Sequence, residues 1–103
     1  MFGEKRYMTR GINAELPMAL IIFLWARIDE LKEESKGNMD YLQVFDLIAI
    51  DDPGIIENQM IIHRTEVPEY SRSHAVTVDK PITDKIYVID SVNHSTMLFA
   101  REY

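Results

Sequence analysis

The sequence contains no cysteine, which excludes disulfides, thiolate zinc sites and cysteine nucleophiles. Small secreted domains usually depend on disulfides, so this absence favours a cytoplasmic protein. Glycine is also scarce, and the four glycines are too scattered along the chain to form a loop that cradles a phosphate group. The sequence therefore does not predict a nucleotide-binding loop.

The chain also lacks an apolar run long enough to span a membrane. Its longest run, residues 18–26, has nine apolar residues, whereas a spanning helix needs about 20. Cations precede this run as they do in a signal peptide, but Pro17 interrupts the pattern and Arg27 follows without a small-residue cleavage site. We therefore expect the run to belong to the folded protein, and we expect no membrane partner.

Positive charge is in the minority. The 11 Lys and Arg residues stand against 17 Asp and Glu residues, which gives a formal net charge of −6. An acidic protein repels phosphate backbones, and this disfavours nucleic acid as a partner. The start of the chain is an exception, because Lys5, Arg6 and Arg10 gather there. Arg6 and Arg10 are candidates for anion binding, and pairing with acidic residues of the same chain is the alternative.

The remaining composition is that of an ordinary globular protein. Of the 103 residues, 47% are hydrophobic and 27% are charged, which is typical of a folded chain. A chain of this length fits one domain with its own core. We therefore expect residues 1–103 to form one domain.

The hydrophobic pattern predicts a short first strand, then one long helix, and then a series of strands, in the order β-α-β-β-(β)-β-β. Pro17 suits the first turn of a helix, Gly37 suits the residue after its end, and the residues between them favour helix. Runs rich in β-branched and aromatic residues predict strands at residues 6–12, 41–50, 55–66, 85–91 and 96–102, with a further short strand at 75–78 left open. This order predicts an α+β fold, in which the helix packs on a mostly antiparallel sheet of about five strands.

Three connections are predicted between these elements. Residues 51–54 contain Pro53 and Gly54 and predict a type II turn. Residues 67–74 are polar and contain a proline, so they predict a loop. The last two strands are close in sequence and predict a hairpin.

The predicted helix is apolar on every side over residues 18–26. A single sheet can cover only one side of such a helix. Either the sheet and the N-terminal strand of the same chain wrap around it, or a second copy covers the remaining side. If a second copy does so, Met18, Ile22 and Trp25 are the candidate self-association residues.

Polar residues gather at residues 63–74, and their types are those of acid–base chemistry or anion binding. The candidate ligand or partner residues in this segment are His63, Arg64, Glu66, Tyr70, Arg72 and His74. The sequence fixes no pair of nucleophile and base, and no histidine has the spacing of metal ligands. The alternative is an ordinary surface loop, with His63 as a core histidine. No catalytic residue, metal or cofactor is predicted.

The start of the chain resembles a known family. The resemblance lies in Tyr-x-Thr-Arg-Gly at residues 7–11, Leu-Pro at residues 16–17 and Phe-Leu-Trp at residues 23–25. On these motifs the chain resembles, over its whole length, an uncharacterised family of small proteins from Gram-positive bacteria and their phages, named domain of unknown function 960. The resemblance implies a bacterial or phage origin and brings no activity, cofactor or catalytic residue.

Three hypotheses for the function follow from these observations. The first is a non-enzymatic interaction or accessory protein that self-associates through its helix or its sheet. The second is a small enzyme or anionic-ligand binder that uses residues 63–74, which requires a histidine of this segment to converge with an arginine around a pocket. The third is weak nucleic-acid binding through the N-terminal arginines.

Overall fold

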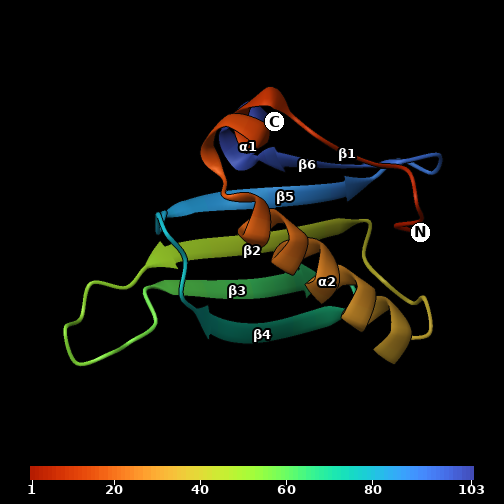
Figure 1. Ribbon diagram of the computed structural model, residues 1–103. Helices are drawn as coiled ribbons and strands as arrows, with labels where there is room; N and C mark the ends of the chain where they lie inside the picture. The colour runs from red at the N-terminus through yellow and green to blue at the C-terminus, as the bar shows by residue number, and fades with distance from the viewer.

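The strands form one mixed six-stranded sheet, and a long helix crosses one of its faces (Figure 1). The computed structural model describes residues 1–103. The helices are α1 (Arg10–Glu15), α2 (Met18–Glu34) and the final 3₁₀ turn η1 (Ala100–Glu102). The strands are β1 (Arg6–Met8), β2 (Leu42–Ala49), β3 (Gln59–Glu66), β4 (Glu69–Val76), β5 (Asp84–Asp90) and β6 (Ser95–Phe99). The predicted α+β class is confirmed.

The sheet has the strand order β1-β6-β5-β2-β3-β4. All neighbouring strands are antiparallel except β1, which runs parallel to β6. The chain builds the sheet in two parts, β2-β3-β4 and β5-β6, which join where β5 pairs with β2. The mostly antiparallel sheet and the final hairpin are confirmed. The sheet has six strands rather than about five, and the sequence does not predict its parallel edge pair.

Helix α2 closely matches the predicted helix. Its buried residues recur every three or four positions and form one stripe that faces the sheet, consisting of Leu20, Ile21, Leu24, Ile28 and Leu31. Pro17 lies just before the first turn rather than inside it. The helix ends as predicted, because Gly37 has a φ of +83° and its N–H bonds to the Lys32 carbonyl at 3.0 Å. No helix of the protein combines the length and the hydropathy that crossing a membrane requires.

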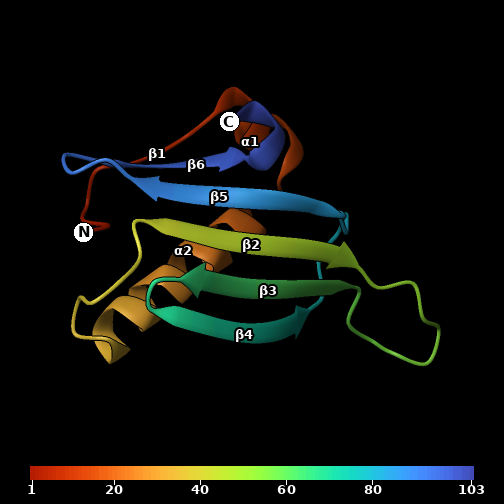
Figure 2. The same cartoon turned by 180° about the vertical axis from the view of Figure 1, so that it is seen from behind.

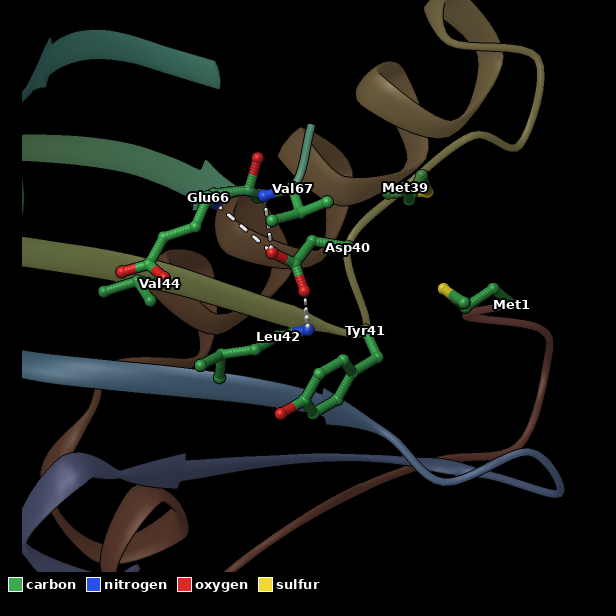
Figure 3. Close-up of a pocket in the computed structure, with 9 residues that line it drawn as sticks. Met1, Met39, Asp40, Tyr41, Leu42, Val44, Glu66 and Val67 are labelled. Atoms are coloured by element: carbon green, nitrogen blue, oxygen red, sulfur yellow. Dashed lines mark hydrogen bonds between the residues drawn. The ribbon is translucent and has the colours of Figure 1, made fainter. Parts of the chain in front are cut away.

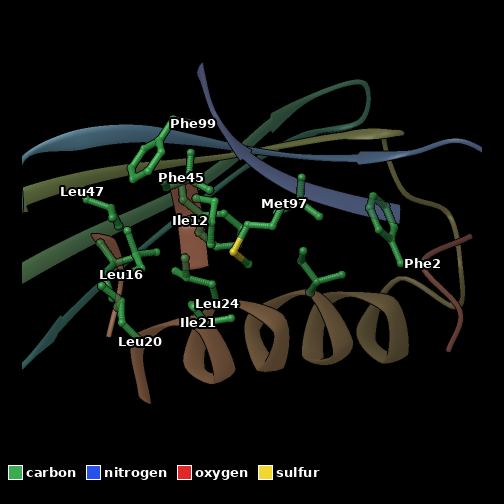
Figure 4. Packing of buried hydrophobic residues seen from close by; sticks show 14 of the residues in the cluster. Phe2, Ile12, Leu16, Leu20, Ile21, Leu24, Phe45, Leu47, Met97 and Phe99 are labelled. Carbon is green, nitrogen blue, oxygen red and sulfur yellow. The ribbon is translucent and has the colours of Figure 1, made fainter. Parts of the chain in front are cut away.

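The hydrophobic core lies between α2 and the sheet (Figure 4). Phe45 and Phe99 enter it from the sheet and are fully buried. The segment before β1 adds Phe2, which is also fully buried. The Phe2 N–H donates to Asp90 Oδ1 at 2.9 Å, and its carbonyl accepts from Arg6 Nη2 at 2.9 Å. Phe2, which precedes the first strand, is therefore part of the core.

The polar segment at residues 67–74 is not a loop, and that prediction is wrong. Val67 and Pro68 form the turn, and strand β4 follows with continuous pairing to β3. The strand includes the first two residues of the short strand left open at 75–78. It lies at the edge of the sheet, so its side chains alternate between half-buried under α2 and exposed. A strand with one face and one edge in water can be polar, which is why its composition resembles that of a loop.

Smaller predictions about turns and ends are also wrong. The first strand is shorter than predicted, because Thr9 Oγ1 accepts the Ile12 N–H at 3.3 Å and starts helix α1. The turn at residues 51–54 is not type II, since Gly54 does not have the positive φ that this turn requires. The final strand is also short and passes into the turn η1.

The side of α2 that faces away from the sheet is partly open to solvent. Met18 is 56% exposed and Ile22 is 61% exposed. Trp25 is half-buried, and the Arg6 guanidinium lies 4.8 Å from the centre of its ring. The alternative that the chain's own sheet wraps the whole helix is therefore wrong. Coverage of Met18 and Ile22 by a second copy stays a prediction.

Candidate functional site

The candidate residues at 63–74 lie on two opposite faces of the sheet. Because side chains alternate along β3 and β4, His63, Tyr70, Arg72 and His74 face α2. Arg64 and the exposed Glu66 point to the other face. The segment therefore does not form one cluster around one pocket.

His63 is a core histidine, as the alternative interpretation predicted. It is fully buried, and its Nε2 donates to Gln43 Oε1 at 2.6 Å. Its ring stacks on Phe45 with the ring centres 4.4 Å apart, and Tyr70 meets it edge-on at 5.1 Å. Burial, together with the nearby charge of His74 and of two arginines, lowers the pKa of His63 to about 3. The ring is therefore neutral near pH 7.

Arg72 and His74, the remaining polar residues of β4 that face the helix, contact side chains of α2. Arg72 Nη1 lies 2.8 Å from Glu30 Oε1 and 3.2 Å from Glu34 Oε1. His74 meets Phe23 edge-on, with the ring centres 5.6 Å apart, and burial together with a nearby arginine charge lowers the pKa of His74. The structure brings together no group of three or more His, Asp or Glu side chains that could hold a metal ion.

The two N-terminal arginines have different surroundings. Arg6 lies 2.5 Å from Asp29 on α2, and it also donates to the backbone carbonyls of Gly3 and Phe2 at 2.9 Å. This confirms the intramolecular pairing predicted for it. Arg10 is exposed at the start of α1 and makes no ion pair or side-chain hydrogen bond. The two residues do not share one strand face.

A pocket of about 430 Å³ lies where the loop before β2 meets the turn between β3 and β4 (Figure 3). We call it the Asp40 pocket. Its lining consists of Met1, Met39, Asp40, Tyr41, Leu42, Val44, Thr65, Glu66 and Val67. Most of these side chains are apolar, and of the sequence candidates only Glu66 is among them.

Asp40 connects the two segments that form this pocket. Its Oδ1 accepts the N–H of Leu42 at 3.1 Å, and its Oδ2 accepts those of Glu66 and Val67 at 3.2 and 3.0 Å. Partial burial acts to raise the pKa of the Asp40 carboxyl, but the three N–H donors outweigh it and hold this pKa below its ordinary value. Asp40 is therefore a fixed negative charge at the end of the sheet.

The face of the sheet opposite α2 carries no helix (Figure 2). We call it the open face. On the three central strands its apolar and aromatic residues are Leu42, Val44, Ile48, Met60, Ile62, Tyr87 and Ile89. Its charged residues on the same strands are Asp46, Arg64, Glu66 and Lys85, and Arg64 Nε donates to Asp46 Oδ2 at 2.6 Å. A sheet with one face in water ordinarily places polar residues on that face, so this composition is unusual.

The sequence interpretation missed both features, although a signal for the open face was present. Residues 41–50 are apolar at most positions rather than at alternate ones. Near-continuous apolar runs indicate strands that are buried on both faces. The Asp40 pocket had no such signal, because its walls come from segments that are distant in sequence.

The fold and these surfaces define a small two-layer α+β protein with a largely apolar open face. Residues 5–102 match the family described as Staphylococcal protein of unknown function (DUF960), and the chain belongs to this family. The predicted resemblance is therefore confirmed.

A solved structure shares the fold. It is described as the crystal structure of the protein of unknown function from Enterococcus faecalis, and it is similar to this chain with a TM-score of 0.74 and 21% sequence identity. The similarity covers 100% of this chain and 98% of that one. At this identity the similarity shows the fold alone. No curated protein matches the chain.

Proposed function

We propose that the protein is a non-enzymatic interaction module that works as a homodimer joined through the open face. The apolar composition of that face carries the proposal. Ile48 is 43% exposed there, and Met60, Ile62 and Tyr87 are half-buried. Full burial of one such side chain contributes about 1.5–3 kcal/mol relative to leaving it in water. An apolar patch of this kind is typical of a contact surface.

The size of the open face fits a dimer. Six strands about 4.8 Å apart and about seven residues long present a face of roughly 650 Å². Two copies packed through this face would bury about 1,300 Å², which is near the lower end for specific interfaces. Two sheets pack in this way about 10 Å apart, with their strands nearly aligned. The product would have four layers, with the helices outside and the two sheets inside.

Charge also favours a second copy as the occupant of this face. The protein carries a net charge of −6, so two copies repel each other over most of their surfaces. The centre of the open face is different, because Asp46 and Arg64 neutralise each other and Lys85 lies across from Asp46. Two copies can therefore approach through this face with little repulsion.

Sedimentation equilibrium over a range of concentrations tests the proposal. The chain has a mass of 12.0 kDa, and the wild type should sediment with twice that mass. Ile48→Arg and Ile62→Arg each place a cation in the apolar contact and should weaken the dimer at least about tenfold. Both positions reach solvent in one copy, so circular dichroism should show an unchanged fold.

The matched control is Ile22→Arg, which makes the same change on the exposed side of α2. It should leave the dimer intact. A wild type that is monomeric at every concentration overturns the proposal. So does a dimer that survives both sheet variants, or one that only Ile22→Arg dissociates.

A further inference from the structure

The Asp40 pocket joins apolar walls to two carboxylates. Leu42, Val44 and Val67 form apolar walls, and Glu66 extends its side chain over Val44 (Figure 3). Tyr41, whose side chain is 58% exposed, closes another side. Pockets that bind small groups share this design, in which apolar walls surround a few polar groups.

The negative charge in the pocket is fixed and forms no ion pair within the chain, although Arg64 on the same strand lies near enough to Glu66 to interact with its charge. Three backbone N–H groups hold Asp40 in place and keep it ionised. Glu66 belongs to the same lining; its backbone N–H donates to Asp40, and its carboxylate extends away from Asp40 over Val44 (Figure 3). The ion pairs of the protein involve other carboxylates, and neither Asp40 nor Glu66 takes part in one. The pocket therefore complements a cation and repels an anion.

We propose that the Asp40 pocket binds a primary ammonium group on an aliphatic chain, in the form of a lysine side chain from a partner protein. The apolar walls fit the hydrocarbon stem of lysine, and the carboxylates fit its terminal charge. A compact ammonium suits this site better than a guanidinium, because Asp40 Oδ2 already accepts two N–H groups and offers no free edge for a bidentate contact. This inference does not rest on the proposed dimer, although Leu42 and Val44 line both the pocket and the open face.

A nuclear magnetic resonance titration tests the proposal, with n-butylammonium as the probe. The backbone amides of Leu42, Glu66 and Val67 should shift on titration. Butyrate, which has the opposite charge, and butanol, which has none, should leave these amides unchanged. Glu66→Gln should weaken binding at least about threefold, because it removes one of the two charges.

The matched control is Glu69→Gln, which removes the same charge three positions away on a residue outside the pocket. It should bind like the wild type. Unchanged affinity in Glu66→Gln overturns the proposal. An equal loss of affinity in both variants overturns it as well, because the charge would then act from a distance.

Short peptides separate a protein partner from a free amine. A capped Gly-Gly-Lys-Gly-Gly peptide should bind at least as tightly as n-butylammonium, and the same peptide with norleucine in place of lysine should not bind. Equal binding of the two peptides contradicts recognition of the ammonium group. Binding of n-butylammonium without binding of the lysine peptide contradicts a protein partner.

Discussion

His63 makes the stability of this fold depend on pH in a way that can be worked out. The ring is fully buried against Phe45, and burial followed by nearby positive charge lowers its pKa from 6.5 to about 3. In the unfolded chain the ring regains its ordinary pKa and takes up a proton near pH 6.5. The unfolded state therefore binds this proton first. Stability must fall as the pH drops below 6.5, down to about 3.

The magnitude follows from this window. Each pH unit within it costs about 1.4 kcal/mol, so His63 should remove about 2 kcal/mol of unfolding free energy between about pH 7.5 and about pH 5. The result depends little on the folded pKa, because a ring with any pKa below about 4 stays neutral in the folded protein at pH 5. Such a loss is a large part of the roughly 5–15 kcal/mol that holds a domain folded.

Urea unfolding at these two pH values, followed by circular dichroism, measures the effect. His63→Gln keeps an N–H donor for Gln43 but cannot be protonated, so its loss of stability should be smaller than that of the wild type by about 2 kcal/mol. His94→Gln removes an exposed histidine in a turn and should behave like the wild type. His74 titrates in all three proteins and cancels from the comparison. Equal losses in wild type and His63→Gln would refute the reasoning.

Two further predictions concern the N-terminal segment and the Asp40 pocket. Arg6→Ala should cost about 2 kcal/mol, because its guanidinium bonds to Asp29 and to two backbone carbonyls, and it should shift Trp25 fluorescence to longer wavelength. The control is Arg64→Ala on the open face, which should leave the Trp25 spectrum unchanged. An unchanged Trp25 spectrum in Arg6→Ala would contradict the assigned packing. Asp40→Asn should cost about 1 kcal/mol in urea unfolding, because an amide cannot accept all three N–H groups. Since the pKa of Asp40 is lowered from 3.8, its contribution to stability is present above that pH and is lost below it. The difference in unfolding free energy between the wild type and Asp40→Asn should therefore shrink toward about pH 3, and a constant difference would argue against this role.

The sequence predicts the parts of the fold that are periodic and buried. Helix α2 and strands β2, β3 and β5 are long enough for their apolar spacing to identify them. Strand β4 could not be recognised from the sequence, because its exposed edge and face tolerate residues such as Ser71 and Ser73 that are also common in loops. Helix α1 is only six residues long and starts from a local contact of Thr9 rather than from a hydrophobic pattern.

The candidate surfaces could be predicted only in part. The excess apolar surface of α2 was evident from the sequence, and Met18 and Ile22 are indeed exposed in one copy. The cluster expected at residues 63–74 does not form, because strand alternation sends neighbouring residues to opposite faces. The Asp40 pocket depends on backbone donors, whose positions become known only when the turn after β3 is placed beside the start of β2.

The pairing of β1 with β6 has a consequence for how the chain is made. Arg6 lies opposite Ser95, so β1 finds its neighbour only after the segment that contains strands β2 to β5 has been synthesised. Until then Phe2 and Ile12 have no finished core to enter. Closure of this edge is a late event in folding, because contacts between distant segments form slowly. A nascent chain that stops before Ser95 would keep these apolar residues uncovered and would be a target for proteases and chaperones.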